Sequence, residues 1–579
     1  MTPRIHDLVP TALRRSWATS GHYPDLDLYA LFRAHRVTDP HRTAVIDAQG
    51  ATSYAELDDR ARCLAAGLAA AGVCPGDVVG IQLPNGWPAV AADLATAALG
   101  AVALPFPVGR GSREVRSLLS RSGARAVIAA TEQRGVEHAG DLVALADALP
   151  ALRTVIAAGT GSTPEGCLSL DDLLRTGTTE FAAARTDPDA AARILVSSGT
   201  EAEPKMIAYS HNALVGGRGN TLAALLPDRL PPRCLFLVPL GSAFGTAGTA
   251  VTLARHGGTL VLLDRFTPDA ALEAIHAHRP THVLCVPTMV RMMLDPLAKE
   301  PRPPTGLTAV VLGGSPLDAN TRDEARRAFD CPVVNLYGSA DGVNCHTGLA
   351  ENAEPDPGLG VTAGTPDPAV CEIRIAPLPG TGPAEPGEPA EPREPREPGE
   401  PGEPGEPGEP GEPGEIIARG PMTPMCYVGA PELNMRYRTA DGWVRTGDLG
   451  VLDDDGTLRV VGRLKDIVIR GGANISPAEV EGELSAHPDV RDVICLGVPD
   501  PLMGERLAAC VVPNYGRRPT LESLGAHLAA RGLERRKHPE HLLLIDDELP
   551  LTPAGKPDRA TLRARLAAPG PPTHHAQAG

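Results

Sequence analysis

The feature that most constrains the fold is an alternation of short apolar strands with amphipathic helices, which runs over residues 53–155 and resumes at 233–330. One helix is predicted to begin at Ser53, because Glu56 stands three residues later in the capping-box position. Residues 77–83 then predict a buried strand. Repeated βα units of this kind are typical of the α/β class, with layered helices and a substantially parallel sheet.

The length of 579 residues exceeds one ordinary hydrophobic core, so we expect at least two domains. The large α/β domain is predicted over residues 1–462. After Gly462 the pattern becomes a compact α+β unit, and residues 463–568 predict a small C-terminal domain. Residues 569–579 predict a flexible tail.

A tract rich in Glu, Pro and Gly occupies residues 383–415. Residues 385–415 contain eleven glutamates and two arginines, so they carry nine of the seventeen net negative charges of the chain. The Gly-x-y run is too short for collagen, and the composition predicts a disordered, extended linker loop between two strands. A partner-binding role is the alternative.

Composition also bears on localisation and partners. No basic segment followed by an apolar run begins the chain, and the most apolar long stretch, around 88–108, is interrupted by Asp93 and several prolines. Eleven cysteines without paired spacing indicate a reduced chain. We therefore expect a cytoplasmic protein with no membrane span. Outside the Glu/Pro/Gly tract the chain is still moderately acidic. This argues against a nucleic-acid-binding surface, which needs a basic face.

The run V-S-S-G-T-E-A-E-P-K at 196–205 has the composition of a phosphate-binding loop. Small residues allow backbone N–H groups to approach an anion, hydroxyls add donors, and Lys205 supplies charge. Taken alone, the run is equally compatible with an ordinary turn. It is not the P-loop of GTPases, because G-x-x-x-x-G-K-[ST] is absent.

Four further runs extend this hypothesis. They are N-L-Y-G-S-A-D-G at 335–342, W-V-R-T-G-D-L-G at 443–450, G-R-L-K-D-I-V-I-R-G-G-A-N-I-S-P-A-E-V-E at 462–481 and L-P-L-T-P-A-G-K-P-D-R at 549–559. In order and spacing the five runs resemble those of the acyl-adenylate-forming (AMP-dependent synthetase/ligase) superfamily. The resemblance extends from about residue 28 to 566.

The resemblance implies a two-step ligase. A carboxylate attacks the α-phosphate of Mg-ATP to give acyl-AMP and pyrophosphate, and a thiol, usually that of coenzyme A, then attacks the acyl carbon. It also implies that the small domain moves between the two steps. ATP, Mg²⁺ and coenzyme A are the expected cofactors, and an aliphatic, alicyclic or aryl carboxylic acid is the expected substrate. No carrier domain is fused, so free coenzyme A is favoured over a separate acyl carrier protein.

The resemblance also assigns site residues. Lys556 is expected to bridge the carboxylate and the α-phosphate, where charge builds in the transition state. Lys205 and Thr200 are expected to act on the β- and γ-phosphates, and Asp341 and Thr200 to hold the metal ion. Nucleotide- and coenzyme-binding roles are implied for Ser197, Ser198, Gly199, Gly313, Gly314, Tyr337, Gly338, Ala340, Asp448, Arg463, Lys465, Gly471 and Gly472.

Among these residues, Tyr337 is expected to stack on adenine beside Gly313 and Gly314. Asp448 and Arg463 are expected to reach the ribose. Lys465 matches the interdomain hinge, and the loop containing Gly471 and Gly472 matches the thiol tunnel. The acyl pocket is expected to draw on residues 242–245, 314–316 and 338–341, while His211 either faces that pocket or packs internally.

The chain departs from the family pattern mainly beside the phosphates. Glu201 and Ala202 replace a threonine and a glycine, and Ala340 and Asp341 replace a threonine and a glutamate. Ser242 stands where a pocket histidine is familiar. These changes leave several functions open: a complete acyl-CoA ligase, an adenylation-impaired enzyme using supplied acyl-AMP, a stand-alone adenylation enzyme loading a carrier protein, or a nucleotide-binding scaffold.

Overall fold

The structure is a computed structural model that describes most of residues 5–567. Within that range it leaves out residues 160, 178–179, 198–203, 229, 300–304, 351–361, 378–410, 471–472, 501–502, 534, 547 and 553–555. The predicted Glu/Pro/Gly linker and the predicted C-terminal tail therefore fall almost entirely outside the described residues.

One eight-stranded sheet of the large domain carries the predicted phosphate loop. Its strands, in spatial order, are β18 (Cys426–Tyr427), β9 (Met206–Ser210), β8 (Ala191–Val196), β4 (Val102–Pro105), β3 (Val78–Gln82), β5 (Ala126–Ala130), β6 (Thr154–Ala158) and β7 (Leu168–Ser169). The strands from β8 to β7 pair in parallel, as the βα pattern predicts. Only β8–β9 and β9–β18 are antiparallel, so the predicted loop connects a hairpin at this edge.

A second eight-stranded sheet provides the predicted nucleotide motif. Its strands, in spatial order, are β15 (Val343–His346), β14 (Val333–Ser339), β13 (Ala309–Gly313), β12 (His282–Cys285), β10 (Arg233–Phe236), β11 (Thr259–Leu262), β1 (Thr43–Asp47) and β2 (Gly50–Ser53). The six strands from β14 to β1 are parallel. Antiparallel strands close both edges.

The largest hydrophobic core joins the two sheets. It includes buried residues of α2 (Leu28–Thr38), α3 (Tyr54–Ala70) and α4 (Trp87–Ala98), together with residues of both sheets. The capping box of α3 forms as predicted, since Ser53 accepts from the Glu56 N–H and Glu56 accepts from the Ser53 N–H. Almost every residue of the helix α4 is buried, which agrees with its largely apolar sequence.

Further helices cover the sheets or lie between them. Two separate cores pack helices on the sheets: one with α5 (Ser112–Ser122) and α6 (His138–Ala144), the other with α9 (Pro268–His278), α10 (Pro287–Lys299) and α11 (Ala319–Phe329). The shorter helical elements are η1 (Ala146–Ala148), α7 (Leu170–Thr176), η2 (Ala213–Arg218), α8 (Gly219–Ala223), η3 (Gly245–Ala247) and η4 (Gly248–Arg255). Within the described residues, no helix combines the length and apolar character needed to cross a bilayer.

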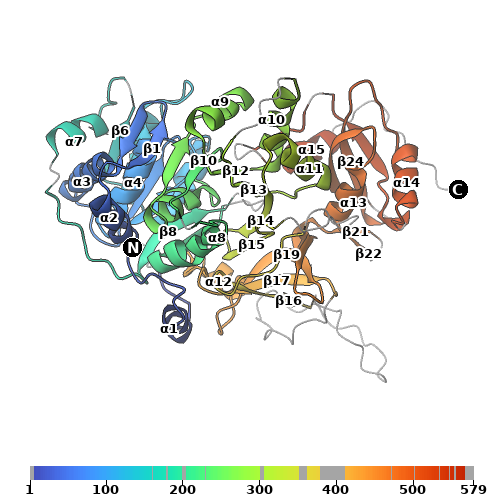
Figure 1. Cartoon of the computed structure of the whole chain (residues 1–579), viewed down its shortest axis with the longest axis horizontal. Helices are drawn as coiled ribbons and strands as arrows, with labels where there is room; N and C mark the ends of the chain where they lie inside the picture. The colour runs from blue at the N-terminus through green and yellow to red at the C-terminus, as the bar shows by residue number, and fades with distance from the viewer. Residues whose placement is uncertain are drawn as a thin grey trace.

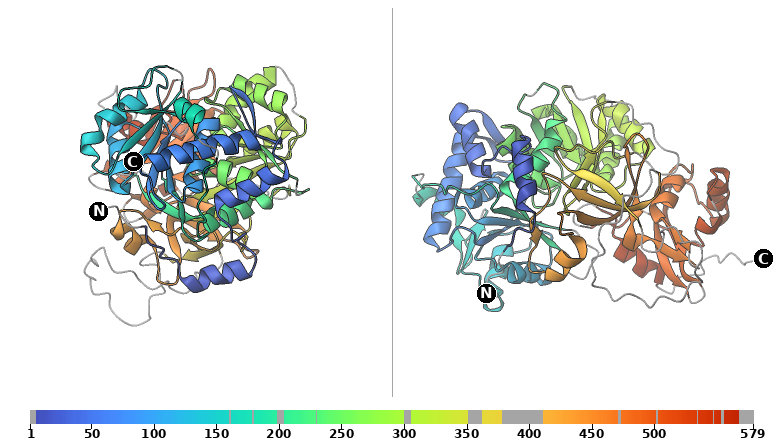
Figure 2. Two further views of the ribbon diagram at one scale, coloured as in Figure 1. Left: turned by 90° about the vertical axis from the view of Figure 1, so that its left-hand side faces the viewer. Right: turned by 90° about the horizontal axis from the view of Figure 1, so that it is seen from below.

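A four-stranded antiparallel sheet leads to the smaller C-terminal domain (Figures 1 and 2). Its strands are β16 (Glu372–Ala376), β17 (Gly414–Arg419), β19 (Val444–Leu452) and β20 (Leu458–Arg463), with α12 (Pro431–Tyr437) preceding β19. The strands β16 and β17 pair from Glu372↔Arg419 to Ala376↔Glu415, so the Glu/Pro/Gly tract lies between two hairpin-paired strands, as predicted.

The C-terminal domain is built on a five-stranded sheet at one end of the long axis of the molecule (Figure 1). Its elements are η5 (Leu464–Asp466), β21 (Val468–Arg470), β22 (Ala473–Ile475), α13 (Pro477–Leu484), β23 (Val490–Asp500), β24 (Gly504–Pro513), α14 (Leu521–Ala530), η6 (Arg535–Lys537), β25 (His541–Leu544) and α15 (Arg559–Ala567). This α+β composition agrees with the fold class predicted from the sequence.

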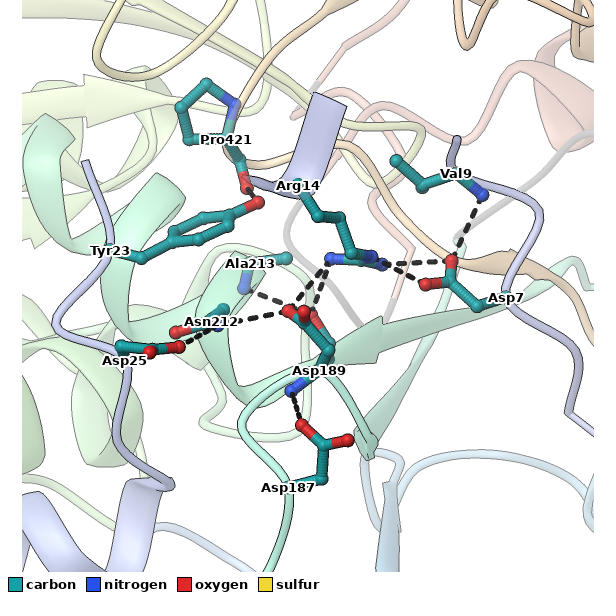
Figure 3. A network of polar contacts seen from close by, with 11 residues as sticks. Asp7, Val9, Arg14, Tyr23, Asp25, Asp187, Asp189, Asn212, Ala213 and Pro421 are labelled. Atoms are coloured by element: carbon teal, nitrogen blue, oxygen red, sulfur yellow. Dashed lines mark hydrogen bonds and ion pairs between the residues drawn. The ribbon is translucent and has the colours of Figure 1, made fainter. Parts of the chain in front are cut away.

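The N-terminal segment is attached to the large domain through a buried arginine of α1 (Thr11–Thr19), shown in Figure 3. Arg14 is 4% exposed and donates to Asp7 and, through Nη1, to the Ser210 hydroxyl at 3.2 Å. Tyr23 adds a hydrogen bond from its hydroxyl to the Pro421 carbonyl at 2.9 Å. Because Ser210 ends β9, this network supports the strand that follows the phosphate loop.

Candidate active site

The two described ends of the predicted phosphate loop are held together by the β8–β9 hairpin. The Ser197 N–H donates to the Lys205 carbonyl at 3.0 Å, and the Lys205 N–H donates to the Ser197 hydroxyl at 3.1 Å. Ser198, Gly199, Thr200, Glu201 and Ala202 lie outside the described residues. Their predicted roles, including the metal contact of Thr200, stay predictions.

Lys205 points to the predicted nucleotide motif. Its Nζ lies 3.8 Å from Oδ1 of Asp341, a carboxylate that is 7% exposed. The same oxygen accepts a hydrogen bond from the Tyr427 hydroxyl at 2.7 Å, and Oδ2 accepts one from the Ser339 hydroxyl at 2.8 Å. The two predicted residues on the phosphate side, Lys205 and Asp341, are therefore neighbours.

Asp341 is the described residue whose chemistry fits a magnesium ion. Each carboxylate oxygen accepts one hydrogen bond and retains a further lone pair. Mg²⁺ is commonly bound by one or two carboxylates, substrate phosphates and water, rather than by a cage of protein groups. Among the described residues there is no cluster of three or more metal-binding side chains.

The backbone of the nucleotide motif is fixed by side chains behind it. The Tyr209 hydroxyl donates to the Ala340 carbonyl at 2.8 Å. Arg218 donates to the Ser339 carbonyl and to the Ala243 carbonyl, each at 3.3 Å. Arg218 therefore connects this motif to the start of the predicted acyl pocket, although no motif in the sequence singles it out.

The predicted ribose residues meet at the paired strands β19 and β20. Asp448 lies opposite Arg463 in the strand register, and its Oδ1 is 3.0 Å from Arg463 Nε. Its Oδ2 accepts a hydrogen bond from the Tyr337 hydroxyl at 2.8 Å. Burial raises the pKa of Asp448, while Arg463 and the Tyr337 hydroxyl oppose that rise.

The sequence did not predict the direct contact between Tyr337 and Asp448. It assigned Tyr337 to adenine stacking and Asp448 to the ribose. The structure brings both residues together with Arg463, and the Asp448 carboxylate retains lone pairs for further donors. Their roles toward a nucleotide stay predictions.

Glycines keep the neighbouring surface open. A Cβ at Gly313 would lie 3.0 Å from the Leu336 carbonyl oxygen, and one at Gly338 would lie 2.6 Å from Asn344 Oδ1. Gly314 has a φ of +84°, which disfavours any other residue there. Gly314 is therefore favoured by its backbone conformation, and a side chain at Gly313 or Gly338 would crowd the neighbouring atoms.

Lys556 extends from the small domain to this glycine-rich surface. Its Cε lies 3.6 Å from the position that a Cβ of Gly314 would occupy. Burial and, to a smaller extent, the charge of Arg463 lower the pKa of Lys556 to about 8, while Asp448 opposes the shift. The Thr552 N–H donates to the Lys556 carbonyl at 2.7 Å.

An ion pair also joins the small domain to the large domain. Arg291 of α10 donates to Asp318 of the large domain, and its other terminal nitrogen lies 3.2 Å from Asp492 Oδ1 of β23. Figure 1 shows the small domain beside α10 and α11. The predicted residues thus form three sets of contacts: Lys205 with Asp341, Tyr337 and Arg463 with Asp448, and Lys556 beside Gly314.

Comparisons with known proteins identify the family of this chain. Residues 32–392 match the model of the AMP-binding enzyme family, and residues 479–556 match its C-terminal domain model. The chain belongs to the AMP-binding enzyme family. Its members include acyl-CoA ligases and aryl-adenylating enzymes among the relatives of this chain.

Individual relatives of the family cover nearly the whole chain. A salicyl-AMP ligase / salicyl-S-ArCP synthetase of Mycobacterium tuberculosis is 32% identical over 97% of this chain and 95% of its own. A feruloyl-CoA synthase of an Amycolatopsis species is 34% identical, covering 91% and 96%. The solved amide bond synthetase McbA of Marinactinospora thermotolerans has a TM-score of 0.76 at 28% identity, covering 93% and 100%.

The residues predicted to form the acyl pocket make mostly local contacts. The Ser242 hydroxyl donates to the Pro239 carbonyl at 2.7 Å and accepts from the N–H of Gly245, the first residue of η3, at 3.0 Å. The Phe244 ring approaches Gly313, with its Cε1 3.4 Å from the position of a Cβ there. An aromatic edge therefore adjoins the glycine-rich surface.

His211 is a packing residue. It is fully buried and its Nδ1 accepts from the Leu28 N–H at 3.2 Å. Burial lowers the pKa of His211 to about 4, so the ring stays neutral near neutral pH. Of the two roles considered from the sequence, internal packing is the one observed.

The remaining predicted residues belong to the start of the small domain. Lys465 lies in η5 directly after β20, at the junction where a hinge is predicted. Gly471 and Gly472 lie outside the described residues, between β21 and β22. Their predicted roles in domain movement and thiol access stay predictions.

Sequence reasoning missed two tyrosines close to Lys205. Tyr427 lies on β18, which pairs with β9, and Tyr437 ends α12. Both residues fall in the run between the strand β17 and the W-V-R-T-G-D-L-G motif, more than 200 positions after Lys205. Spacing gives no signal for such a contact, because only the pairing of β18 with β9 brings the two segments together.

Proposed function

We propose that this chain is an acyl-CoA ligase that activates a carboxylic acid with ATP and transfers the acyl group to coenzyme A. The observation that carries the proposal is the approach of Lys556, from the small domain, to Gly314 beside the Asp448–Arg463 pair. A cation introduced by a separate domain at this point suits a reaction in which two anions must approach each other.

In the first step, a carboxylate oxygen attacks the α-phosphorus of ATP and the bond to pyrophosphate breaks. Lys556 orients the carboxylate and α-phosphate, Lys205 binds the β- and γ-phosphates, and Asp448 accepts from the ribose hydroxyls. Asp341 is the residue that would hold Mg²⁺, which supplies neutralisation of phosphate charge when bound. In the second step, the thiolate sulfur attacks the acyl carbon and AMP leaves.

We propose an aryl carboxylic acid as the substrate class. Several relatives are named for aryl acids, including salicylate, ferulate and a hydroxynaphthoate. The Phe244 ring beside Gly313 would offer an aromatic contact to a planar acid. A medium-chain fatty-acid–CoA ligase of Escherichia coli, 29% identical, makes an aliphatic acid the alternative.

We place the reaction in the cytoplasm. All eleven cysteines are free thiols, and nine of them are buried. A chain of this kind suits a reducing compartment.

The test is to incubate the full chain with ATP, Mg²⁺ and a panel of aryl and medium-chain acids. Pyrophosphate is measured without and with coenzyme A, and acyl-CoA is identified by mass spectrometry. We expect acid-dependent pyrophosphate and an acyl-CoA product. Turnover of synthetic acyl-AMP without pyrophosphate release from ATP would identify the adenylation-impaired enzyme instead.

Two further outcomes would overturn the proposal. Acyl-AMP formed but passed only to an added phosphopantetheinylated carrier protein would identify a carrier-loading enzyme. Nucleotide binding without turnover of either ATP or acyl-AMP would identify a scaffold.

A further inference from the structure

Two tyrosine rings surround the ammonium group of Lys205. Its Nζ lies 3.8 Å from the centroid of the Tyr437 ring and 5.6 Å from that of Tyr427. The two ring centroids are 5.8 Å apart, with the planes tilted by 49°. The Lys205 side chain is 12% exposed, so the ammonium has lost most of its water and its attraction to the ring faces is strengthened.

Tyr427 also holds the carboxylate that faces this ammonium. Its hydroxyl donates to Asp341 Oδ1 at 2.7 Å, and Lys205 Nζ lies 3.8 Å from the same oxygen. The phenol therefore acts as a hydrogen-bond donor to the carboxylate.

The two tyrosines are fixed to each other through Asn434 of α12. The Tyr427 N–H donates to Asn434 Oδ1 at 2.8 Å, and Asn434 Nδ2 donates back to the Tyr427 carbonyl at 2.9 Å. Tyr427 itself is paired with Ile207, two residues after Lys205, in the β18–β9 register. Tyr427 therefore lies on the strand paired with β9, directly after Lys205, and Asn434 attaches the helix that ends at Tyr437 to that strand.

We propose that Tyr427 and Tyr437 are positioning residues for triphosphate binding. Tyr437 holds the Lys205 ammonium against its ring face, and Tyr427 orients the Asp341 carboxylate through its hydroxyl. The lysine and the carboxylate are thereby placed before ATP arrives. This inference rests on the proposed function of Lys205 toward the β- and γ-phosphates.

The physical benefit is preorganisation of a flexible cation. Lysine has a long side chain that loses rotamer freedom when it is fixed on a phosphate. If the ring already restricts that side chain in the free protein, less of this loss accompanies ATP binding. The effect should be confined to ligands that carry the β- and γ-phosphates.

The experiment compares the binding of Mg-ATP and of AMP by calorimetry, without acid, for the full chain and its variants. We expect Tyr437→Leu to weaken ATP binding about tenfold and to leave AMP binding unchanged, because AMP lacks the phosphates that Lys205 contacts. Tyr437→Phe keeps the ring and should recover most of the loss. Tyr427→Phe should weaken ATP binding about threefold, again without an effect on AMP.

The fully exposed Tyr515 of the small domain provides a matched control, since Tyr515→Leu removes a tyrosine ring from the surface. Thermal unfolding of each variant shows whether it is folded. Equal losses for ATP and AMP, or an unchanged ATP affinity in a folded Tyr437→Leu variant, would overturn the inference. Failure of the unmodified chain to bind ATP would instead overturn the proposed function.

Discussion

At the residue scale, the proposed chemistry depends on Lys556 being charged when the carboxylate and ATP meet. Burial lowers its pKa to about 8, from an ordinary value of 10.5. Between these two values the unfolded chain binds more protons than the folded chain, so the contribution of this group to stability increases with pH. Its contribution to adenylation changes in the opposite direction, because the ammonium is lost as pH rises through about 8.

We therefore predict that kcat/KM for pyrophosphate release declines above a pH of about 8. Lys556→Arg should move this decline to higher pH, because a guanidinium stays charged. Lys556→Ala should reduce the rate by about a hundredfold or more throughout. An unchanged alkaline decline in Lys556→Arg would show that another group titrates.

The residues near the phosphates were only partly predictable. Motifs singled out Lys205, Asp341, Asp448 and Lys556, because side-chain type and order along the chain carry that information. Motifs did not single out Tyr427, Tyr437 or Arg218, whose roles arise from strand pairing and side-chain direction. The orientation of Glu201 lies outside the described residues.

At the element scale, strands and helices formed where the sequence predicted them when hydrophobic periodicity and helix caps indicated the same element. The α3 capping box and the parallel strands β3 to β5 are examples. The arrangement of the N-terminal segment was not predicted, because α1 has no side-chain cap and its buried Arg14 looks like a surface residue in the sequence.

We predict that Arg14→Met lowers the free energy of unfolding by about 2–3 kcal/mol. This is less than the loss expected when a fully buried ion pair is broken, because Asp7 and Asp189 are partly exposed. The loss leaves Asp7 and the Ser210 hydroxyl without their shared donor. Denaturant unfolding measures it. The exposed Arg15 on the same helix is the matched control, and equal effects of Arg14→Met and Arg15→Met would contradict the assigned role.

At the scale of the whole molecule, the position of the small domain decides which group faces the active site. Sequence predicted two domains but not their relative placement, because few motifs report on an interface between domains. In the structure Lys556 and the Arg291–Asp492 pair lie on the same interface. We infer that this arrangement corresponds to the first of the two proposed steps.

We predict that Arg291→Glu slows acid-dependent pyrophosphate release about threefold, because a partly exposed ion pair contributes up to about 1 kcal/mol. Thioester formation from synthetic acyl-AMP should be unaffected or faster. The double variant Arg291→Glu/Asp492→Arg restores the attraction between the two positions and should recover part of the rate of pyrophosphate release. Arg265→Glu, at an exposed position of the large domain, controls for the charge change.

We propose above all that this chain forms an acyl-adenylate with the help of Lys556. Exchange of labelled pyrophosphate into ATP tests it most directly, because exchange reports reversible adenylation without any thiol acceptor. We predict exchange that requires a carboxylic acid, occurs without coenzyme A and is lost in Lys556→Ala. Absence of acid-dependent exchange across the panel, in a chain that binds ATP, would contradict the claim.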